Sequence, residues 1–259
     1  MGERERTRPA LELAGAFVLL TRLNLAWLLA GHPPVTIDRT VWAFPLIGAV
    51  VGVVGGAAYA ACAWAGMPPV VASVWALTVM VVVTGALHED GLADTADGFG
   101  GGRTRERKLE IMRDSHIGSF GAIALILSLA ARGAAIAALG RPLRVLPALV
   151  TAASLGRAAV VVPLLLLVPA RSDGLAVGLR AMRRSRAVAA LAIAAFLALV
   201  LMPLGAALRA MVGAVIVAVV LSWIAWRQIG GYTGDVLGAV SLVAECVAIG
   251  MMAIMKAGH

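Results

Sequence analysis

The chain has 259 residues, of which 61% are hydrophobic and only 14% are charged, and its mean hydropathy is +0.94. This composition excludes a soluble globular domain and is typical of a polytopic membrane protein. The net charge of +8 at pH 7 does not indicate a nucleic-acid partner, because the arginines lie mostly in short connections between apolar runs. We therefore predict an all-α, multi-span protein of the lipid bilayer that binds no nucleic acid.

Seven apolar segments are long enough to cross a bilayer, which takes about twenty residues of helix. An earlier apolar stretch, residues 11–30, also has this length, but it carries Glu12, Arg22 and Asn24. No internal repeat or low-complexity linker divides the chain, so we predict a single integral membrane domain over residues 1–259. The seven predicted spans are residues 41–64, 70–87, 118–140, 145–169, 188–207, 210–229 and 236–255.

The basic connections predict how the chain is oriented. Arg and Lys gather in residues 88–117 and 171–187, and connections of this kind stay on the cytoplasmic side. Two spans separate them, and counting spans in both directions brings residues 31–40 and 230–235 to the same side. The basic N-terminus should also lie inside, so we predict that residues 11–30 do not cross but lie in the interface or re-enter the membrane. Every connection with unusual chemistry then faces the cytoplasm.

The connection at 88–117 is acidic as well as basic. Asp90, Asp94 and Asp97 follow the spacing i, i+4, i+7, which puts them on one helical face if the helix of 70–87 continues past the membrane surface. Like charges at this spacing destabilise a helix, and Mg²⁺ is the natural compensation because it takes oxygen ligands. We predict that these three carboxylates bind Mg²⁺, with Asp114 as a further ligand. The alternative is a solvated acidic end of a helix.

Two titratable residues stand directly before this acidic triad. His88 is a candidate metal ligand or general base, with an interfacial side chain as the alternative. Glu89 is the other candidate base, although on a helix it points about 100° away from Asp90. The residues alone do not choose between the two.

The same connection is rich in glycine and arginine. Glycines permit close backbone approach, and free backbone amides bind phosphate. Arginine guanidinium groups bind phosphate oxygens in pairs. A carboxylate triad, glycines and arginines together indicate a site for a diphosphate whose charge is shared between Mg²⁺ and guanidinium groups. The residues concerned are Gly98, Gly100, Gly101, Gly102, Arg103, Arg105, Arg107, Lys108 and Arg113.

A further polar cluster surrounds the start of the last predicted span. Tyr232 and Trp226 fit an aromatic belt at the membrane interface, and Asp235 is a candidate helix N-cap. Glu245 lies about ten residues inside the span, where a carboxylate is expensive and is a functional candidate. The alternative for Glu245 is a structural pair with Arg157 or Arg132.

Several blocks of the sequence resemble the cobalamin synthase family, also called adenosylcobinamide-GDP ribazoletransferases. The opening "FVLLTRLN" (Phe17–Asn24) is similar to that family's first motif, but Asn24 and Leu25 stand where a proline commonly follows. The resemblance covers nearly the whole chain, and the block from Gly85 to Gly121 is the most specific part. The other blocks are "FPLIGAVVG" (Phe44–Gly52), "GALHEDGLADTADGFGGG" (Gly85–Gly102), "RERKLEIMRDSHIGSFG" (Arg105–Gly121) and "GGYTGDVLGA" (Gly230–Ala239).

The resemblance implies a Mg²⁺-dependent enzyme of the bacterial cytoplasmic membrane that completes the cobalamin nucleotide loop. Such an enzyme joins adenosylcobinamide-GDP to α-ribazole, or to its 5′-phosphate, and releases GMP. It further implies an active site in an acidic, Gly-rich catalytic loop at about 88–117, facing the cytoplasm. The implied catalytic residues are His88, Glu89, Asp90, Asp94 and Asp97, and the implied metal ligands are Asp90, Asp94, Asp97 and Asp114. The implied substrate-binding residues are Arg22, Gly98, Gly100, Gly101, Arg105, Arg113, Ser115, Tyr232 and Asp235.

Three other classes of protein share parts of this pattern. Membrane CDP-alcohol phosphotransferases and prenyltransferases also use spaced aspartates with Mg²⁺, but this chain lacks a further D-x₃-D pair and a second aspartate-rich motif. A transporter or channel would explain Glu245, but transporters place polar residues near the midplane and often contain repeats. The sequence leaves the oligomeric state open, with a homo-oligomer as one alternative.

Overall fold

The protein is described by a computed structural model covering residues 8–23, 26–32 and 34–254, and within these ranges it forms helices and no β-strand. The predicted all-α class is confirmed. The longer helices are α3 (Phe44–Trp64), α4 (Pro69–Thr84), α5 (Leu87–Gly101), α7 (Ser119–Leu139), α8 (Pro142–Ala159), α11 (Arg184–Leu201), α12 (Leu204–Ile229) and α13 (Gly234–Ala253). The shorter ones are α1 (Pro9–Leu20), η1 (Ala26–Leu29), α2 (Ile37–Thr40), η2 (Val41–Ala43), α6 (Arg105–Ile111), α9 (Val161–Leu166), α10 (Leu175–Gly178) and η3 (Leu179–Ala181).

Six helical segments of the described chain are long and apolar enough to cross a membrane, and the number rises to seven if the bent pair α4 and α5 counts as one span. The prediction of about seven spans is confirmed. One predicted boundary is wrong: the span at 188–207 runs through Pro203, where the chain instead turns between α11 and α12. Proline interrupts a helix because it lacks an N–H and its ring clashes with the preceding turn.

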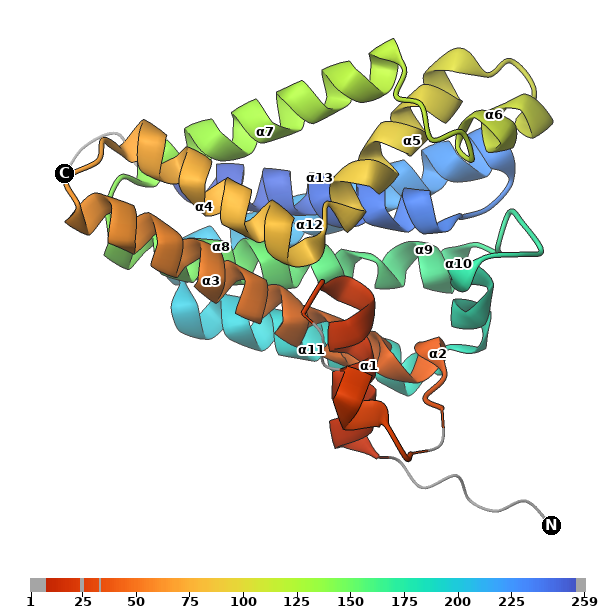
Figure 1. Ribbon diagram of the computed structural model, residues 1–259, viewed down its shortest axis with the longest axis horizontal. Coiled ribbons are helices and arrows are strands. Elements are labelled where there is room, and N and C mark those ends of the chain that lie inside the picture. The colour runs from red at the N-terminus through yellow and green to blue at the C-terminus, as the bar shows by residue number, and fades with distance from the viewer. Residues whose placement is uncertain (1–7, 24–25, 33, 255–259) are drawn as a thin grey trace.

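Apart from α5, which runs obliquely, the long helices lie side by side along the long axis of the molecule (Figure 1). The connections α3–α4, α7–α8 and α11–α12 lie at one end, whereas α6, the segment 167–183 and the turn 230–233 lie at the other (Figure 1). This arrangement agrees with the predicted parity, in which the connections with unusual chemistry share one side.

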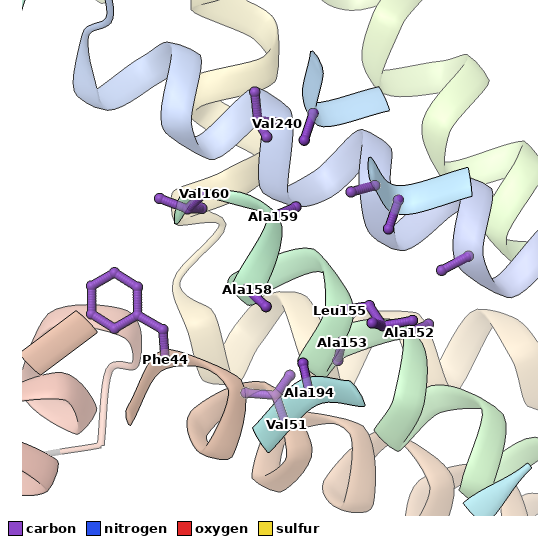
Figure 2. Close-up of a cluster of buried hydrophobic side chains, with 14 of the residues drawn as sticks. Phe44, Val51, Ala152, Ala153, Leu155, Ala158, Ala159, Val160, Ala194 and Val240 are labelled. Atoms are coloured by element: carbon purple, nitrogen blue, oxygen red, sulfur yellow. The ribbon is translucent and has the colours of Figure 1, made fainter. Parts of the chain in front are cut away.

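Helix α8 forms the centre of the bundle and packs against α3, α11 and α13. Small residues allow this close packing: a Cβ added at Gly52 would lie only 2.6 Å from backbone atoms of Leu149 and Val150. Figure 2 shows the alanine-rich face of α8 between Val51 of α3, Ala194 of α11 and Val240 of α13. The contact between α3 and α8 therefore depends on close approach of the two backbones.

The chain bends by 89° between α4 and α5. Gly85 (φ 63°) and Ala86 (φ 58°) both adopt left-handed backbone conformations there, which ends α4 and starts α5 in a new direction. The condition that the 70–87 helix continues past the membrane surface is therefore not met, although Asp90, Asp94 and Asp97 still share one helix, α5. The expected loop at 88–117 is also wrong in its secondary structure, because most of it forms α5 and α6.

The N-terminal helix α1 has 12 residues, too few to span a bilayer, and lies at the side of the bundle, crosswise to the long helices (Figure 1). The buried Glu12 fixes α1 in place: both its oxygens accept hydrogen bonds from Arg186, and Oε2 also accepts one from the Trp42 indole at 2.8 Å. The prediction that 11–30 contains no span is confirmed for the described part. Asn24 and Leu25 lie outside the described residues.

Candidate active site

A cavity of about 320 Å³ opens where α1, α3, α5, α8 and α13 meet the segment 169–177. Its apolar wall includes Leu20, Phe44, Val160 and Leu237. Its polar lining consists of His88, Asp90, Arg157, Arg171, Asp173, Tyr232, Thr233 and Asp235. The cavity thus brings together parts of the chain that lie more than a hundred residues apart.

Helices α5 and α13 approach closely at one wall of this cavity. A Cβ added at Gly91 would lie 2.8 Å from the carbonyl oxygen of Asp235, so only glycine allows this contact. Thr233 caps α13 by accepting a hydrogen bond from Val236 N–H at 3.3 Å, and it also donates to Asp235 at 3.1 Å. Asp235 lies in the first turn of α13 and is not the N-cap, so that alternative is wrong.

The segment 168–170, which includes the cavity-lining Pro169, is held to the α12–α13 turn by backbone hydrogen bonds. Ala170 N–H donates to Tyr232 O at 2.8 Å, and Tyr232 N–H donates to Val168 O at 3.0 Å. Tyr232 is fully buried, with 1% of its surface exposed, so the interfacial-belt interpretation is wrong for Tyr232, whereas Trp226 is exposed as that interpretation requires. Tyr232 lines the cavity instead.

An excess of negative charge gathers beside the cavity. The carboxylates of Asp90, Asp97 and Asp235 are all close enough to Asp94 to repel its charge, and Arg171 is the one cation that acts on it. Arg171 also forms an ion pair with Asp235, with 3.5 Å between Nη1 and Oδ2. Asp90 and Asp94 make no hydrogen bond or ion pair within the described residues. These two carboxylates are therefore free to bind a cation.

The donor set fits Mg²⁺ only if substrate supplies further ligands. Among the described residues, no group of three or more His, Cys, Asp or Glu side chains is arranged to hold a metal ion. Mg²⁺ commonly binds through one or two carboxylates, with substrate phosphates and water completing its coordination. Asp90 and Asp94, one turn apart on α5, provide that minimal protein contribution, and the repulsion between them is what a divalent cation would relieve.

The other two predicted metal ligands are occupied by protein donors. Both oxygens of the buried Asp97 accept backbone hydrogen bonds, from Gly118 at 2.7 Å and from Gly121 at 2.8 Å, at the start of α7. Asp114 accepts a hydrogen bond from His116 N–H at 3.0 Å, and the His116 ring nitrogen lies 2.6 Å from the same oxygen. These bonds lower the pKa of Asp114 below its usual value. Neither carboxylate lines the cavity.

The predicted phosphate-binding arginines are engaged with the protein. Arg105 donates to Ile229 O at 2.8 Å and to Ala170 O at 2.7 Å, which ties α6 to the end of α12 and to the cavity wall. Arg113 donates to both oxygens of Asp173 at 2.7 Å. Ser115 is exposed in the connection between α6 and α7. None of the three lines the cavity in this structure.

The predicted phosphate-binding glycines lie in helix α5 and not in a loop. Gly98 packs against Met112, Gly100 against the ring of Phe120, and Gly101 against Ile111. Their role in the structure is close packing of α5 against α6 and α7. Arg22, the remaining predicted substrate-binding residue, lies over Gly85 at the bend between α4 and α5.

A chain of buried ion pairs lies behind the cavity. Arg132 binds Glu89 at 2.8 Å and Glu245 at 3.2 Å, and the other oxygen of Glu245 binds Arg157. The alternative in which Glu245 pairs with Arg157 or Arg132 is confirmed, since it pairs with both. Glu89 is thus held in this network, whereas His88 lines the cavity with its Nδ1 unpartnered.

The two arginines that line the cavity were not predicted as site residues from the sequence. Arg171 was interpreted only as a topology signal, because it lies in a basic connection. Arg157 was considered only as a partner of Glu245, although an arginine within an apolar run is itself a sign of function.

Comparison with known proteins identifies the family of the chain. The chain is 43% identical over 223 residues to the adenosylcobinamide-GDP ribazoletransferase of Bradyrhizobium diazoefficiens, covering 86% of each chain. It is 45% identical over 218 residues to that of Azorhizobium caulinodans, covering 82% of this chain and 83% of the relative. No solved structure matches. Since the cobalamin-5-phosphate synthase family model matches residues 12–253, the chain belongs to that family.

Proposed function

We propose that the protein transfers adenosylcobinamide phosphate from adenosylcobinamide-GDP to α-ribazole or its 5′-phosphate, with release of GMP. The relatives in Bradyrhizobium and Azorhizobium carry the name of this activity. The observation that carries the proposal is the pair of unpartnered carboxylates, Asp90 and Asp94, beside a cavity that also contains His88 and two arginines. Such a set suits phosphoryl transfer, which depends mainly on positioning and charge neutralisation.

Asp90 and Asp94 would hold Mg²⁺ against the diphosphate of the donor. When bound there, the metal would neutralise the negative charge that develops on the leaving phosphate. Arg171, fixed by Asp235 and by its hydrogen bond to Leu109 O at 2.9 Å, places a second positive charge at the same wall. Asp97 serves this site indirectly, because it holds the start of α7 against α5.

The attacking group is a ribose hydroxyl of the acceptor, and its proton must leave as the new P–O bond forms. Nδ1 of His88 is the available acceptor for that proton, because His88 lines the cavity and this nitrogen has no partner among the described residues. Glu89 is a weaker candidate, because its carboxylate is bound to Arg132. The P–O bond between the cobinamide phosphate and the guanosine phosphate breaks, and the guanosine phosphate leaves as GMP.

The site would face the cytoplasm of a bacterial inner membrane. The basic segments 103–113 and 180–186 lie at the end of the bundle that carries α6 and η3 (Figure 1). Positively charged connections remain on the cytoplasmic side. Labelling of single cysteines introduced at Ser115 and Ala65, with a membrane-impermeant reagent, tests this orientation. Outside labelling of Ser115→Cys in intact cells would contradict it.

The decisive experiment is GMP release by the purified protein in liposomes. Adenosylcobinamide-GDP, α-ribazole and Mg²⁺ are supplied together and each is omitted in turn, with a chelator as a further arm. We expect release only when all three are present. If both substrates with Mg²⁺ give no GMP, the proposal fails. CDP-alcohols and prenyl diphosphates would then be the next donors to test, because they place a diphosphate on the same kind of acidic face.

A further inference from the structure

The inner wall of the cavity carries a buried cation that the proposed reaction has not yet used. Arg157 lies on the central helix α8, lines the cavity, and is only 4% exposed. Both its hydrogen bonds within the described chain use Nη1, which donates to Glu245 and, at 3.4 Å, to Ala153 O. Nε and Nη2 therefore retain donors for another partner.

A second observation at the same wall indicates a missing ligand group. His88 is 4% exposed, lines the cavity, and its Nδ1 has no hydrogen-bond partner in the described residues. Arg157 is close enough to act electrostatically on the His88 ring. Buried polar atoms normally have partners, so a buried guanidinium with spare donors and a buried imidazole with an unpartnered nitrogen, both beside one cavity, point to a polar ligand.

The ion-pair chain behind the cavity explains how Arg157 is held. Glu89, Arg132, Glu245 and Arg157 alternate in sign and come from α5, α7, α13 and α8. Three of them lie behind the cavity wall, and Arg157 alone reaches the cavity. Each member is nine-tenths buried or more, so its position is fixed by packing and by its neighbours. The series of ion pairs therefore ends in a rigidly placed cation, the guanidinium of Arg157.

We propose that Arg157 binds a phosphate group of a substrate, and that Glu245, backed by Arg132 and Glu89, is the positioning residue that aims it. This inference rests on the proposed function for the identity of the substrates. The apolar wall suits the aromatic base of a nucleoside, and about 320 Å³ is enough for a small ligand but not for a corrinoid. The acceptor's 5′-phosphate is therefore the first source to test, and the donor's diphosphate is the second.

Binding measurements test the inference without any turnover. Protein in nanodiscs is titrated by calorimetry with α-ribazole, α-ribazole 5′-phosphate and inorganic pyrophosphate. For Arg157→Gln we expect a loss of affinity for the phosphorylated acceptor of about 10- to 100-fold, the effect of losing a charge-assisted hydrogen bond, with unphosphorylated α-ribazole unaffected. Arg157→Lys should recover part of the loss.

One control variant and two further outcomes make the result decisive. A weakened affinity for pyrophosphate, with both acceptors unaffected, would assign Arg157 to the donor's diphosphate and still support an anion site. Arg209→Gln is the matched control, because Arg209 donates to Met251 O at 3.4 Å far from the cavity and should change nothing. Unchanged affinity for all three ligands in a folded Arg157→Gln protein would overturn the proposal. Because these arms need no GMP release, failure of the proposed function would be seen separately.

Glu245 is tested by a readout that general destabilisation would not reproduce. Glu245→Asp keeps the charge but shortens the side chain by one methylene. Its carboxylate should then no longer hold the Arg157 guanidinium in the orientation that binds the phosphate. We expect KM for the phosphorylated acceptor to rise while kcat stays within about 3-fold of the wild type, a factor of less than 1 kcal/mol. An equal fall in kcat for both acceptors, with KM unchanged, would exclude a positioning role.

Discussion

The Asp97 carboxylate accepts a hydrogen bond from the backbone N–H of Gly118, with 2.7 Å between Oδ2 and the nitrogen. Its other oxygen accepts one from Gly121 N–H at 2.8 Å, so Asp97 on α5 caps the start of α7. A carboxylate at this place satisfies free amides and interacts favourably with the helix dipole. Three aspartates that look equivalent in sequence therefore have different roles in the structure.

Replacing Asp97 should mainly reduce the stability of the folded protein. Asp97→Ala removes both bonds to α7, and we expect the free energy of unfolding to fall by about 1–2 kcal/mol, the usual cost of losing a helix cap. The measurement is denaturant titration in mixed micelles followed by tryptophan fluorescence. Unchanged stability together with a lost response to Mg²⁺ would instead make Asp97 a metal ligand.

Replacing Asp94 should instead reduce activity and leave stability unchanged or higher. Asp94→Asn removes a charge that Asp90, Asp97 and Asp235 repel, so stability should stay equal or rise. GMP release should nevertheless fall by about 100-fold or more, because a ligand of the proposed Mg²⁺ is lost. Activity and stability are measured on the same preparation, with Asp38→Asn as the control carboxylate outside the cavity. Full activity at saturating Mg²⁺ would contradict the assignment.

The bend between α4 and α5 offers a test of backbone strain. Ala86 is the one non-glycine residue of the described chain with positive φ, a conformation that costs an alanine about 1–2 kcal/mol. Ala86→Gly should therefore leave stability unchanged or raise it by up to about 1 kcal/mol, after the entropic cost of glycine. Ala96→Gly, within ordinary helix of α5, should lower it by about 1 kcal/mol. Equal losses in both variants would show that Ala86 is unstrained.

The sequence was sufficient to predict the helical class, the approximate number of spans and the acidic segment, because these depend on composition and period. It did not predict the break at Gly85 and Ala86, because an alanine in the left-handed region has no sequence signal of its own. The separate role of Asp97 also could not be predicted, since it depends on where the start of α7 packs. The placement of Arg157 needed the tertiary structure, because four helices must meet to form its ion-pair chain.

The buried ion pairs should be strongly coupled. Arg132→Met leaves Glu89 without a partner, and removing one member of a buried pair costs about 3–5 kcal/mol. Adding Glu89→Gln removes the stranded charge, so the double variant should be more stable than the sum of the single effects predicts. Equilibrium unfolding of the four proteins of the cycle provides the coupling energy. A coupling energy of zero would mean that the two side chains do not interact in the folded protein.

The pair of Arg113 and Asp173 separates direct substrate binding from support of the cavity wall. Both side chains are more than half exposed, so the pair contributes only about 0.2–1 kcal/mol to stability. Asp173 lines the cavity, and we expect the pair to fix the segment 169–177. Arg113→Ala and Asp173→Ala should then raise KM for the donor by similar factors of less than about 5-fold, and the double variant by no more.

The charge-swapped protein provides the control for this last prediction. Arg113→Asp combined with Asp173→Arg can re-form the ion pair, so KM should return toward the wild-type value if the pair acts through the wall. If Arg113 instead contacts a phosphate directly, as its sequence motif suggests, Arg113→Ala alone should raise KM and the swap should not restore it. Steady-state GMP release at varied donor concentration distinguishes the two outcomes, because a wall effect depends on the pair and a phosphate contact depends on the arginine.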